Sequence, residues 1–276
     1  MNCDLHTHTY YSDGFHSPEY LIKLAVSKKL KAIAITDHND VGALTESQKL
    51  AKKEKIELIN GVEINCESTE ILGYFFDPSY EPLLKILEEN SKSINDVVTQ
   101  KIHWLQDNGY NVNLESVLKY TGPTHNLIST HLALELKKNG YVQNLQEAFV
   151  GIIKKINIDY KPKRQSTKKV IAEIKNAGGV AVLPHPWFLH LSLKNDFEYY
   201  SSKLMSYGLS GIETTGPHLT EHDSFITESK EIARKLNLTE SGGSDFHGAV
   251  FFPENELGKY NVDYSVIDQL RKKIEN

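Results

Sequence analysis

Six short groups of histidine, aspartate and glutamate stand along this chain, each following an apolar run. They are His6-Thr7-His8, Asp13, Thr36-Asp37-His38, Gly61-Val62-Glu63, Pro184-His185-Pro186 and Ser244-Asp245-Phe246-His247. Imidazoles and carboxylates are ligands for divalent metals of borderline and hard character. A polar side chain at the end of a buried strand lies at the edge of the sheet, and several strands that end at the same edge bring such side chains together in one polar site. The groups together predict a multinuclear metal site for hydrolysis.

The spacing within the groups supports this interpretation. His6 and His8 are two residues apart on an expected strand, as are Asp245 and His247 near the other end of the chain. Residues two apart on a strand point to the same face, so a pair of this kind can share one ion. Glu63 lies inside the apolar run 59–64. A carboxylate there is unfavourable unless it binds a metal or belongs to a buried ion pair.

Single groups also have simpler explanations. Asp13 precedes a glycine and would serve as a turn residue, and Asp37 would orient a ligand imidazole rather than bind an ion. Two prolines flank His185 and fix the direction of the chain there. Core packing explains one such group, but it does not explain all of them placed after successive strands.

The elements expected to position these groups alternate between strand and helix, which predicts an α/β fold. Ser17 and Pro18 are an N-cap and a first helical residue for a helix that ends near residue 29. Further helices are expected over 43–54, 168–176, 197–207, 224–236 and 266–273. Seven core strands are expected over 2–6, 32–36, 57–64, 71–76, 180–183, 211–214 and 239–242.

The middle of the chain shows only helical patterns from residue 80 to about residue 158. We therefore expect a catalytic domain formed by 1–79 and 160–276, with a helical insertion at 80–159. Residues 81–175 carry 14 Lys and Arg against 10 Asp and Glu, although the whole chain has a net charge of −5. A basic insertion suits a lid that faces an anionic substrate. Charged residues on solvated helix faces explain the same imbalance.

Composition places the chain among ordinary globular proteins, with 276 residues, 39% hydrophobic and 24% charged residues. No stretch is long and apolar enough for a membrane span, and no signal peptide precedes the first strand. Cys3 and Cys66 lie in or beside expected strands, and we interpret them as reduced thiols rather than a disulfide. A cytoplasmic protein is expected.

These motifs resemble those of the PHP (polymerase and histidinol phosphatase) family of metal-dependent phosphoesterases over nearly the whole chain. The resemblance implies a distorted (β/α)7 barrel with a trinuclear site at the C-terminal ends of its strands. The helical insertion is similar to that of one subgroup, which contains nucleoside-phosphate phosphatases and 5′→3′ oligonucleotide exonucleases. The resemblance therefore implies a hydrolase that attacks phosphate esters of nucleotides or short oligonucleotides through a metal-activated hydroxide.

The resemblance also implies the ligands of two or three divalent ions, which would be manganese, iron or zinc. His6, His8, Glu63 and Asp245 would hold the first ion, and Glu63 would bridge to a second ion shared with His185. A third ion would be held by Asp13, His38 and His247. Glu70 stands where the subgroup has histidine, and its oxygen ligands would favour manganese or iron.

At the substrate-binding positions implied by the resemblance, this chain differs from the subgroup. The chain reads Ser129-Thr130-His131 where the subgroup has Arg-Pro-His, so His131 is kept and the arginine is not. Lys163 or Arg164 would supply the missing charge, and His218 lies in a loop that would also contact the substrate. His185, His247 or His131 would protonate the leaving group.

Two other functions stay open. One is a phosphomonoesterase for small molecules of the histidinol-phosphate type, which a comparison of nucleotides with amino-alcohol phosphates would distinguish. The other is a non-catalytic metal-binding or nucleic-acid-binding module, which the near-complete ligand set disfavours. The expected partner is a phosphate-ester substrate, and neither a membrane nor a stable protein partner is expected.

Overall fold

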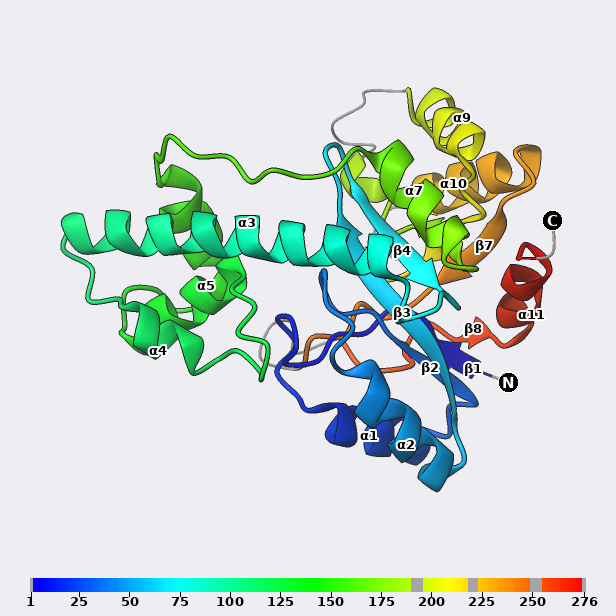
Figure 1. Ribbon diagram of the computed structural model, residues 1–276, viewed down its shortest axis with the longest axis horizontal. Helices are drawn as coiled ribbons and strands as arrows, with labels where there is room; N and C mark the ends of the chain where they lie inside the picture. Colours follow the sequence, from blue (N-terminus) through cyan, green and yellow to red (C-terminus); the bar gives the residue numbers. More distant parts are fainter. Residues whose placement is uncertain (1, 190–195, 218–222, 249–254, 275–276) are drawn as a thin grey trace.

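One mixed sheet organises the computed structural model, which describes residues 2–189, 196–217, 223–248 and 255–274 (Figure 1). Its eight strands lie in the order β7-β6-β5-β4-β3-β2-β1-β8. An isolated bridge between Thr7 and Phe246 joins the chain after β1 to the chain after β7, so the sheet curls into a nearly closed barrel. The strands are β1 (Asn2–Asp4), β2 (Ala32–Ile35), β3 (Glu57–Asn65), β4 (Glu70–Tyr74), β5 (Val180–Leu183), β6 (Gly211–Thr215), β7 (Thr239–Gly242) and β8 (Val262–Asp263).

Most neighbouring strands are parallel, and β4 is the main exception. It runs antiparallel to both β3 and β5, with Glu63 opposite Leu72 and Asn65 opposite Glu70. The end of β3 and the start of β4 therefore lie at one edge of the sheet. This edge is also where the parallel strands have their carboxyl ends, and the reversal of β4 brings Glu70 to it.

Helices on the outside of the barrel cover the sheet. All four residues of β2 are buried, as expected for a strand covered on both sides. The first helix begins as predicted, with the Ser17 side chain accepting a hydrogen bond from the backbone N–H of Tyr20 and Pro18 in the first turn. The covering helices are α1 (Pro18–Ser27), α2 (Leu44–Glu54), α7 (Thr167–Asn176), α9 (Phe197–Tyr207), α10 (Asp223–Lys235) and α11 (Ser265–Lys272).

A group of helices projects from the barrel between β4 and α7 (Figure 1). These elements pack around an apolar cluster of their own, which includes Val98, Leu105, Leu132 and Leu136. A second apolar cluster lies between the barrel and its covering helices. The elements are α3 (Glu81–Asp107), α4 (Leu114–Leu118), α5 (Ser129–Lys138), α6 (Leu145–Glu147), the π-helical turn η1 (Ala148–Ile152) and the 3₁₀ turn η2 (Ile153–Lys155).

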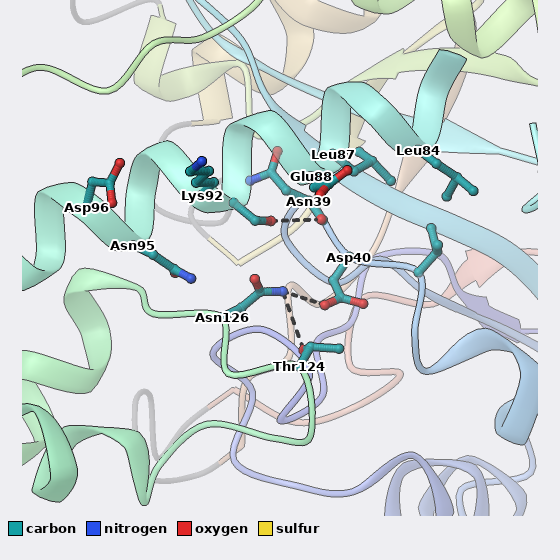
Figure 2. A pocket seen from close by; sticks show the side chains of 12 residues that line it. Asn39, Asp40, Leu84, Leu87, Glu88, Lys92, Asn95, Asp96, Thr124 and Asn126 are labelled. Carbon is teal, nitrogen blue, oxygen red and sulfur yellow. Dashed lines mark hydrogen bonds between the residues drawn. The ribbon is translucent and has the colours of Figure 1, made fainter. Parts of the chain in front are cut away.

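Polar contacts attach this helical segment to the barrel. From α3, the Asn90 amide donates to the Asn39 side chain at 3.1 Å and to the carbonyl of Asn65 at 2.8 Å. The loop before α5 is tied down by a hydrogen bond from Asn126 to Asp40 (Figure 2). Asn39, Asp40 and Asn126 line a pocket of about 520 Å³ between α3 and the loop, which is drawn in Figure 2. The attachment points are thus the loop that follows β2 and the end of β3.

The structure agrees with most of the predicted elements. Strands β5 and β7 and helix α9 have the bounds expected from sequence, and the other covering helices differ from expectation by one or two residues at their ends. The expected count of seven strands missed β8, because two residues carry no readable periodicity. No helix in the described part of the chain is long and apolar enough to cross a membrane. Cys3 and Cys66 are both buried and free.

Candidate metal centre

The first potential metal position lies between the strand ends of β1, β3 and β7. The Nε2 atoms of His6 and His8 lie 3.2 and 3.3 Å from one carboxylate oxygen of Glu63. The same two nitrogens lie 3.3 and 3.2 Å from a carboxylate oxygen of Asp245. Two imidazoles and two carboxylates therefore converge on one point, in a set of ligand atoms that all lie within 4.8 Å of one another.

A second position lies between β3, β4 and β5. Nδ1 of His38 is 3.3 Å from Glu63 and 3.8 Å from Glu70. On the other side, Nε2 of His185 is 2.8 Å from the second oxygen of Glu63 and 3.4 Å from Glu70. Glu63 thus contacts both positions, because one of its oxygens faces His6, His8 and His38 and the other faces His185. Asn65 hydrogen-bonds to Glu70 and holds this side chain toward the centre.

The third position is lined by His8, Asp13, His38 and His247. The carboxylate of Asp13 lies 3.2 Å from Nε2 of His247 and 3.8 Å from Nε2 of His38. The ring of His247 stacks on that of His8, with 4.1 Å between centroids. His8 and His38 therefore each belong to two of the three positions, and the positions form one contiguous cluster.

Backbone pairing beyond the regular strands sets this geometry. His38 and Glu63 form a parallel bridge, and His8 donates its backbone N–H to the carbonyl of Phe246 at 2.9 Å. The chain after β7 approaches β1 so closely that a Cβ at Gly243 would lie 2.4 Å from the backbone of His6. The glycine permits the approach of two protein segments, each of which carries potential ligands.

Two potential ligands have strained backbones. The backbone φ angle is 28° at His185 and 50° at Asp245, and residues other than glycine rarely adopt such positive values. Such strain persists only where the surroundings hold the residue in place, and it concentrates at functional sites. For His185 the surroundings include Glu213, which accepts a hydrogen bond from its backbone N–H at 2.8 Å.

Burial and mutual attraction shift the pKa values of the cluster in opposite directions. Burial raises the pKa of Glu63, but the charges of His38 and His6 outweigh this effect and hold the pKa well below its usual value. Asp13 is held low in the same way by His247 and His38. Burial lowers the pKa of His247, and the neighbouring Asp13 and Asp245 reverse this and raise it to about 10. Carboxylates that stay ionised are suited to bind cations.

Several polar atoms in the cluster have no hydrogen-bond partner. These are Nε2 of His8, Oδ1 of Asp13 and Nδ1 of His38, and all three are buried. Buried polar atoms are nearly always satisfied, so three together indicate a missing partner. All three belong to the potential ligand sets. The residues present therefore fit divalent metal ions.

Comparison with known proteins identifies the group to which this arrangement belongs. The sequence profile of the PHP domain matches residues 4–180, which is more than half of the chain. The chain belongs to the PHP family. The matched region runs from the last residue of β1 through β2, β3, β4 and the whole helical segment, and it ends at the start of β5.

Individual PHP relatives extend the match to most of the chain. A phosphoribosyl 1,2-cyclic phosphate 1,2-diphosphodiesterase of Eggerthella lenta is 26% identical, over 89% of this chain and 94% of the relative. A 3′,5′-nucleoside bisphosphate phosphatase of Chromobacterium violaceum is 26% identical, over 89% and 87%. A 5′-3′ exoribonuclease of Haemophilus influenzae is 28% identical, over 94% of both chains.

Solved structures confirm the expected distorted barrel of the PHP type with its helical insertion. A protein from Bifidobacterium adolescentis described as a metal-dependent phosphoesterase superposes with a TM-score of 0.86, at 24% identity. The alignment covers 98% of this chain and 96% of that protein. At this level of identity the likeness concerns the fold.

Two buried carboxylates that the sequence did not single out contact residues of the PHP centre or the chain beside it. Glu213 on β6 is 3.1 Å from Nδ1 of His6, the ring nitrogen that faces away from the first position. Asp4 on β1 accepts backbone hydrogen bonds from Ser244 at 2.8 Å and Gly258 at 2.7 Å. Both stand in apolar strands, which is the signal that identified Glu63.

Asp37 has the supporting role expected from sequence. Its carboxylate accepts hydrogen bonds from the backbone and hydroxyl of Thr9 and from the hydroxyl of Ser12, at 2.6–2.7 Å. Ser12 in turn lies 3.4 Å from Nδ1 of His8. Burial raises the pKa of Asp37 to about 6. Asp37 thus holds the loop that orients His8 and is absent from the three potential ligand sets.

The expected substrate residues lie in different environments. His131 is buried on α5, next to Thr130, whose hydroxyl donates to Asp13 at 2.9 Å. Lys163 and Arg164 are exposed on the segment that returns to α7, where the backbone N–H of Lys163 donates to Ser93 at 2.7 Å. His218 lies outside the described residues. Of the residues expected to contact substrate, His131 is thus the one placed directly beside the cluster.

Proposed function

We propose that this protein hydrolyses phosphate esters of nucleotides or short oligonucleotides as a metal-dependent phosphoesterase. The names of its relatives support the reaction class, because they act on a cyclic phosphate, a nucleoside bisphosphate and RNA. The observation that carries the proposal is the sharing of Glu63 between two adjacent metal positions. Such sharing holds two cations close together, which is the arrangement used in phosphoryl transfer by paired metals.

The protein would bind two or three divalent ions of manganese, iron or zinc. His6, His8, Glu63 and Asp245 form the first ligand set, and His8, Asp13, His38 and His247 form another. The remaining set is His38, Glu63 and Glu70, with His185 beside it. When bound, such ions supply Lewis acidity toward a phosphoryl group and a water-derived nucleophile at neutral pH. Glu213 and Asp37 keep His6 and His8 in orientation through their Nδ1 sides.

His131 is the proposed hydrogen-bond donor to the substrate. Its Nδ1 accepts the backbone N–H of Ile128 at 3.1 Å, so in the neutral ring the proton resides on Nε2. Burial lowers the pKa of His131, which favours this neutral form. Nε2 has no hydrogen-bond partner, and the ring lines a cavity of about 550 Å³ together with Asp13. His185 and His247 contact carboxylates of the ligand sets, which leaves His131 as the freer hydrogen-bond donor toward a substrate oxygen, and it would protonate a leaving group only in its imidazolium form.

The helical insertion would act as the substrate lid of a cytoplasmic enzyme. Its α5 reaches the centre through Thr130 and His131, and its α3 is tied to the loop that follows β2 and to the end of β3. A separate apolar cluster supports a lid within 80–159 on a barrel of 1–79 and 160–276, although Leu83, Ile86 and Leu87 at the start of α3 belong to the cluster of the barrel. Two buried thiols without a disulfide suit a reducing compartment.

The decisive experiment is phosphate release from a panel of substrates with added Mn²⁺, combined with metal analysis of the purified protein. The panel contains nucleoside mono- and bisphosphates, short oligonucleotides and histidinol phosphate. Turnover of the nucleotides supports the proposal, and preferential turnover of histidinol phosphate would replace it with the small-molecule alternative. A protein that binds no ion and releases no phosphate would instead be a non-catalytic module.

A further inference from the structure

Three buried asparagines, which we call the asparagine relay, connect α3 of the helical segment to Glu70 of the second metal position. Asn90 lies on α3, Asn39 in the loop that follows β2 and Asn65 at the end of β3. The Asn90 amide donates to the side-chain oxygen of Asn39 at 3.1 Å, and the Asn39 amide donates to that of Asn65. The Asn65 amide in turn donates to the carboxylate of Glu70. The four side chains thus form one continuous series of hydrogen bonds.

The groups at the two ends of the relay fix its direction. The backbone N–H of Asn65, which can only donate, lies 3.1 Å from the side-chain oxygen of Asn39. The amide nitrogen of Asn39 therefore faces the side-chain oxygen of Asn65, and the amide nitrogen of Asn65 faces Glu70. An ionised carboxylate only accepts hydrogen bonds, so this direction satisfies it. Turning the amide of Asn39 or of Asn65 would set like groups against each other.

The relay adjoins potential ligands of the second position. Asn65 is two residues after Glu63 on β3, so both side chains lie on the same face of the strand. It also pairs with Glu70 across the antiparallel ladder of β3 and β4. Asn39 comes directly after His38, and its backbone N–H donates to the carbonyl of Glu63 at 2.8 Å. A shift of either asparagine would therefore be felt by the side chains that surround this position.

Glu70 is the potential ligand that most needs such support. Its side chain is 28% exposed, the largest value among the potential ligands of the three positions. A partly exposed glutamate loses rotamer entropy when it is held in one direction, and a fixed donor offsets part of this loss. Asn65 supplies the donor, and its own amide is held by Asn39.

Asn90 occupies a position of α3 where packing alone would favour an apolar residue. Leu83 and Leu87 precede it on the buried face of the helix and belong to the apolar cluster of the barrel. The side-chain oxygen of Asn90 is buried without a hydrogen-bond partner among the described residues, which costs free energy. Its amide nitrogen donates to Asn39 and, at 2.8 Å, to the carbonyl of Asn65. What Asn90 contributes is therefore the support of the other two asparagines.

We propose that Asn90, Asn39 and Asn65 are positioning residues for Glu70, so that the packing of α3 on the barrel sets how tightly the second position holds its ion. The inference rests on the proposed function, because it takes this position to bind a divalent ion. Asn65 acts on Glu70 directly. Asn90 acts from the helical segment through the other two asparagines, which links the proposed lid to the metal centre.

The test is a titration of the metal-free full chain with Mn²⁺, followed by the electron paramagnetic resonance signal of the unbound ion. Asn65→Leu should weaken the most weakly bound ion about 10–100-fold, the usual contribution of a residue that holds a metal ligand. Asn90→Leu should weaken it about three- to tenfold, the contribution of one neutral hydrogen bond. Asn95→Leu is the matched control, because Asn95 on the same helix accepts from the backbone N–H of Leu127 at 2.7 Å and is outside the relay. It should change the affinity less than about twofold.

The same titration in a Glu70→Ala background separates positioning from a general structural role. There, Asn65→Leu and Asn90→Leu should leave the affinity for the remaining ions within about twofold, because the side chain that they position is gone. Far-UV circular dichroism checks the fold, and Asn90→Leu decides the test if Asn65→Leu does not fold.

Three results would overturn the relay: equal losses of affinity with and without Glu70, unchanged affinity in the asparagine variants, or a wild type that binds no Mn²⁺. Mn²⁺ binding that depends on Asn65 and Glu70, in a protein that releases no phosphate from any substrate, would support the relay and contradict the proposed function alone.

Discussion

At the scale of single residues, the sequence reveals ligands more readily than it reveals the groups that support them. His6, Glu63 and Asp245 could be predicted as potential ligands because Glu63 lies inside an apolar run and the other two each have a histidine two residues later. Glu213 carries the same signal on β6, yet its role depends on which atom of His6 it faces, and that is a matter of three-dimensional placement. Asn90 gives no signal, because its partners are set by how α3 packs against the barrel.

Glu63 is the residue on which two metal positions depend, so we expect Glu63→Gln to remove at least one ion. The amide keeps the size of the side chain but loses the charge that two cations share. Activity should fall by more than about 100-fold, because even residues that only support metal ligands contribute 10–100-fold. Metal content per chain and far-UV circular dichroism measure the loss and check the fold. Glu67→Gln, which changes an exposed glutamate four residues later, should behave as wild type. Full metal content and a near-normal rate in Glu63→Gln would disprove the shared position.

Glu70 should influence which metal is preferred. Its carboxylate lies 3.4 Å from His185, and oxygen ligands suit harder ions than imidazole does. We expect Glu70→His to retain activity and to shift the metal giving the highest rate from Mn²⁺ or Fe²⁺ toward Zn²⁺. Rates of metal-free protein reconstituted with each ion in turn measure the shift. An unchanged order of metals would show that Glu70 does not contribute to ion binding.

At the scale of elements, the pattern of apolar runs predicts where strands lie but not their direction. The run at β4 resembles its parallel neighbours in composition, and only the four residues between β3 and β4 indicate that the chain reverses there. The reversal decides that Glu70 reaches the centre. The helical segment could be located from its periodicity, whereas its contact with Asp13 through α5 depends on how the helices pack against one another.

The role of α5 is tested through His131. We expect His131→Ala to lower kcat/KM about ten- to a hundredfold, because the loss of a hydrogen-bond donor buried beside the substrate is not compensated by water. Metal content should stay unchanged, since His131 is outside the three ligand sets. His103→Ala serves as the control, because His103 is an exposed histidine on α3. Kinetics of both variants in the presence of saturating Mn²⁺ measure the effect. Loss of metal in His131→Ala, or a rate equal to wild type, would contradict the proposed donor.

At the scale of the whole molecule, the metal centre joins parts of the chain that are distant in sequence. Its ligand sets draw on residues from 6 to 247, and the barrel closes through the bridge between Thr7 and Phe246 beside them. Ions bound there would cross-link the segment after β1 to the segment after β7. The stability of the fold should therefore depend on metal, to an extent set by ion affinity and concentration.

We expect removal of metal by a chelator to lower the melting temperature and addition of Mn²⁺ to restore it. A ligand at 100 times its dissociation constant stabilises the folded state by about 2.7 kcal/mol, which corresponds to roughly 5–10 °C for a protein of this size. The physical cause is charge balance. When no ion is bound, the ionised carboxylates of Glu63, Asp13 and Asp245 are neutralised only by the neighbouring protonated imidazoles, and bound cations would complete the neutralisation. Differential scanning calorimetry of the chelated and reconstituted protein measures the shift. In Glu63→Gln the response to Mn²⁺ should be smaller, whereas in Lys85→Met, which changes an exposed lysine of α3, it should be unchanged. Equal melting temperatures with and without metal in the wild type would show that the cluster does not hold ions in the folded chain.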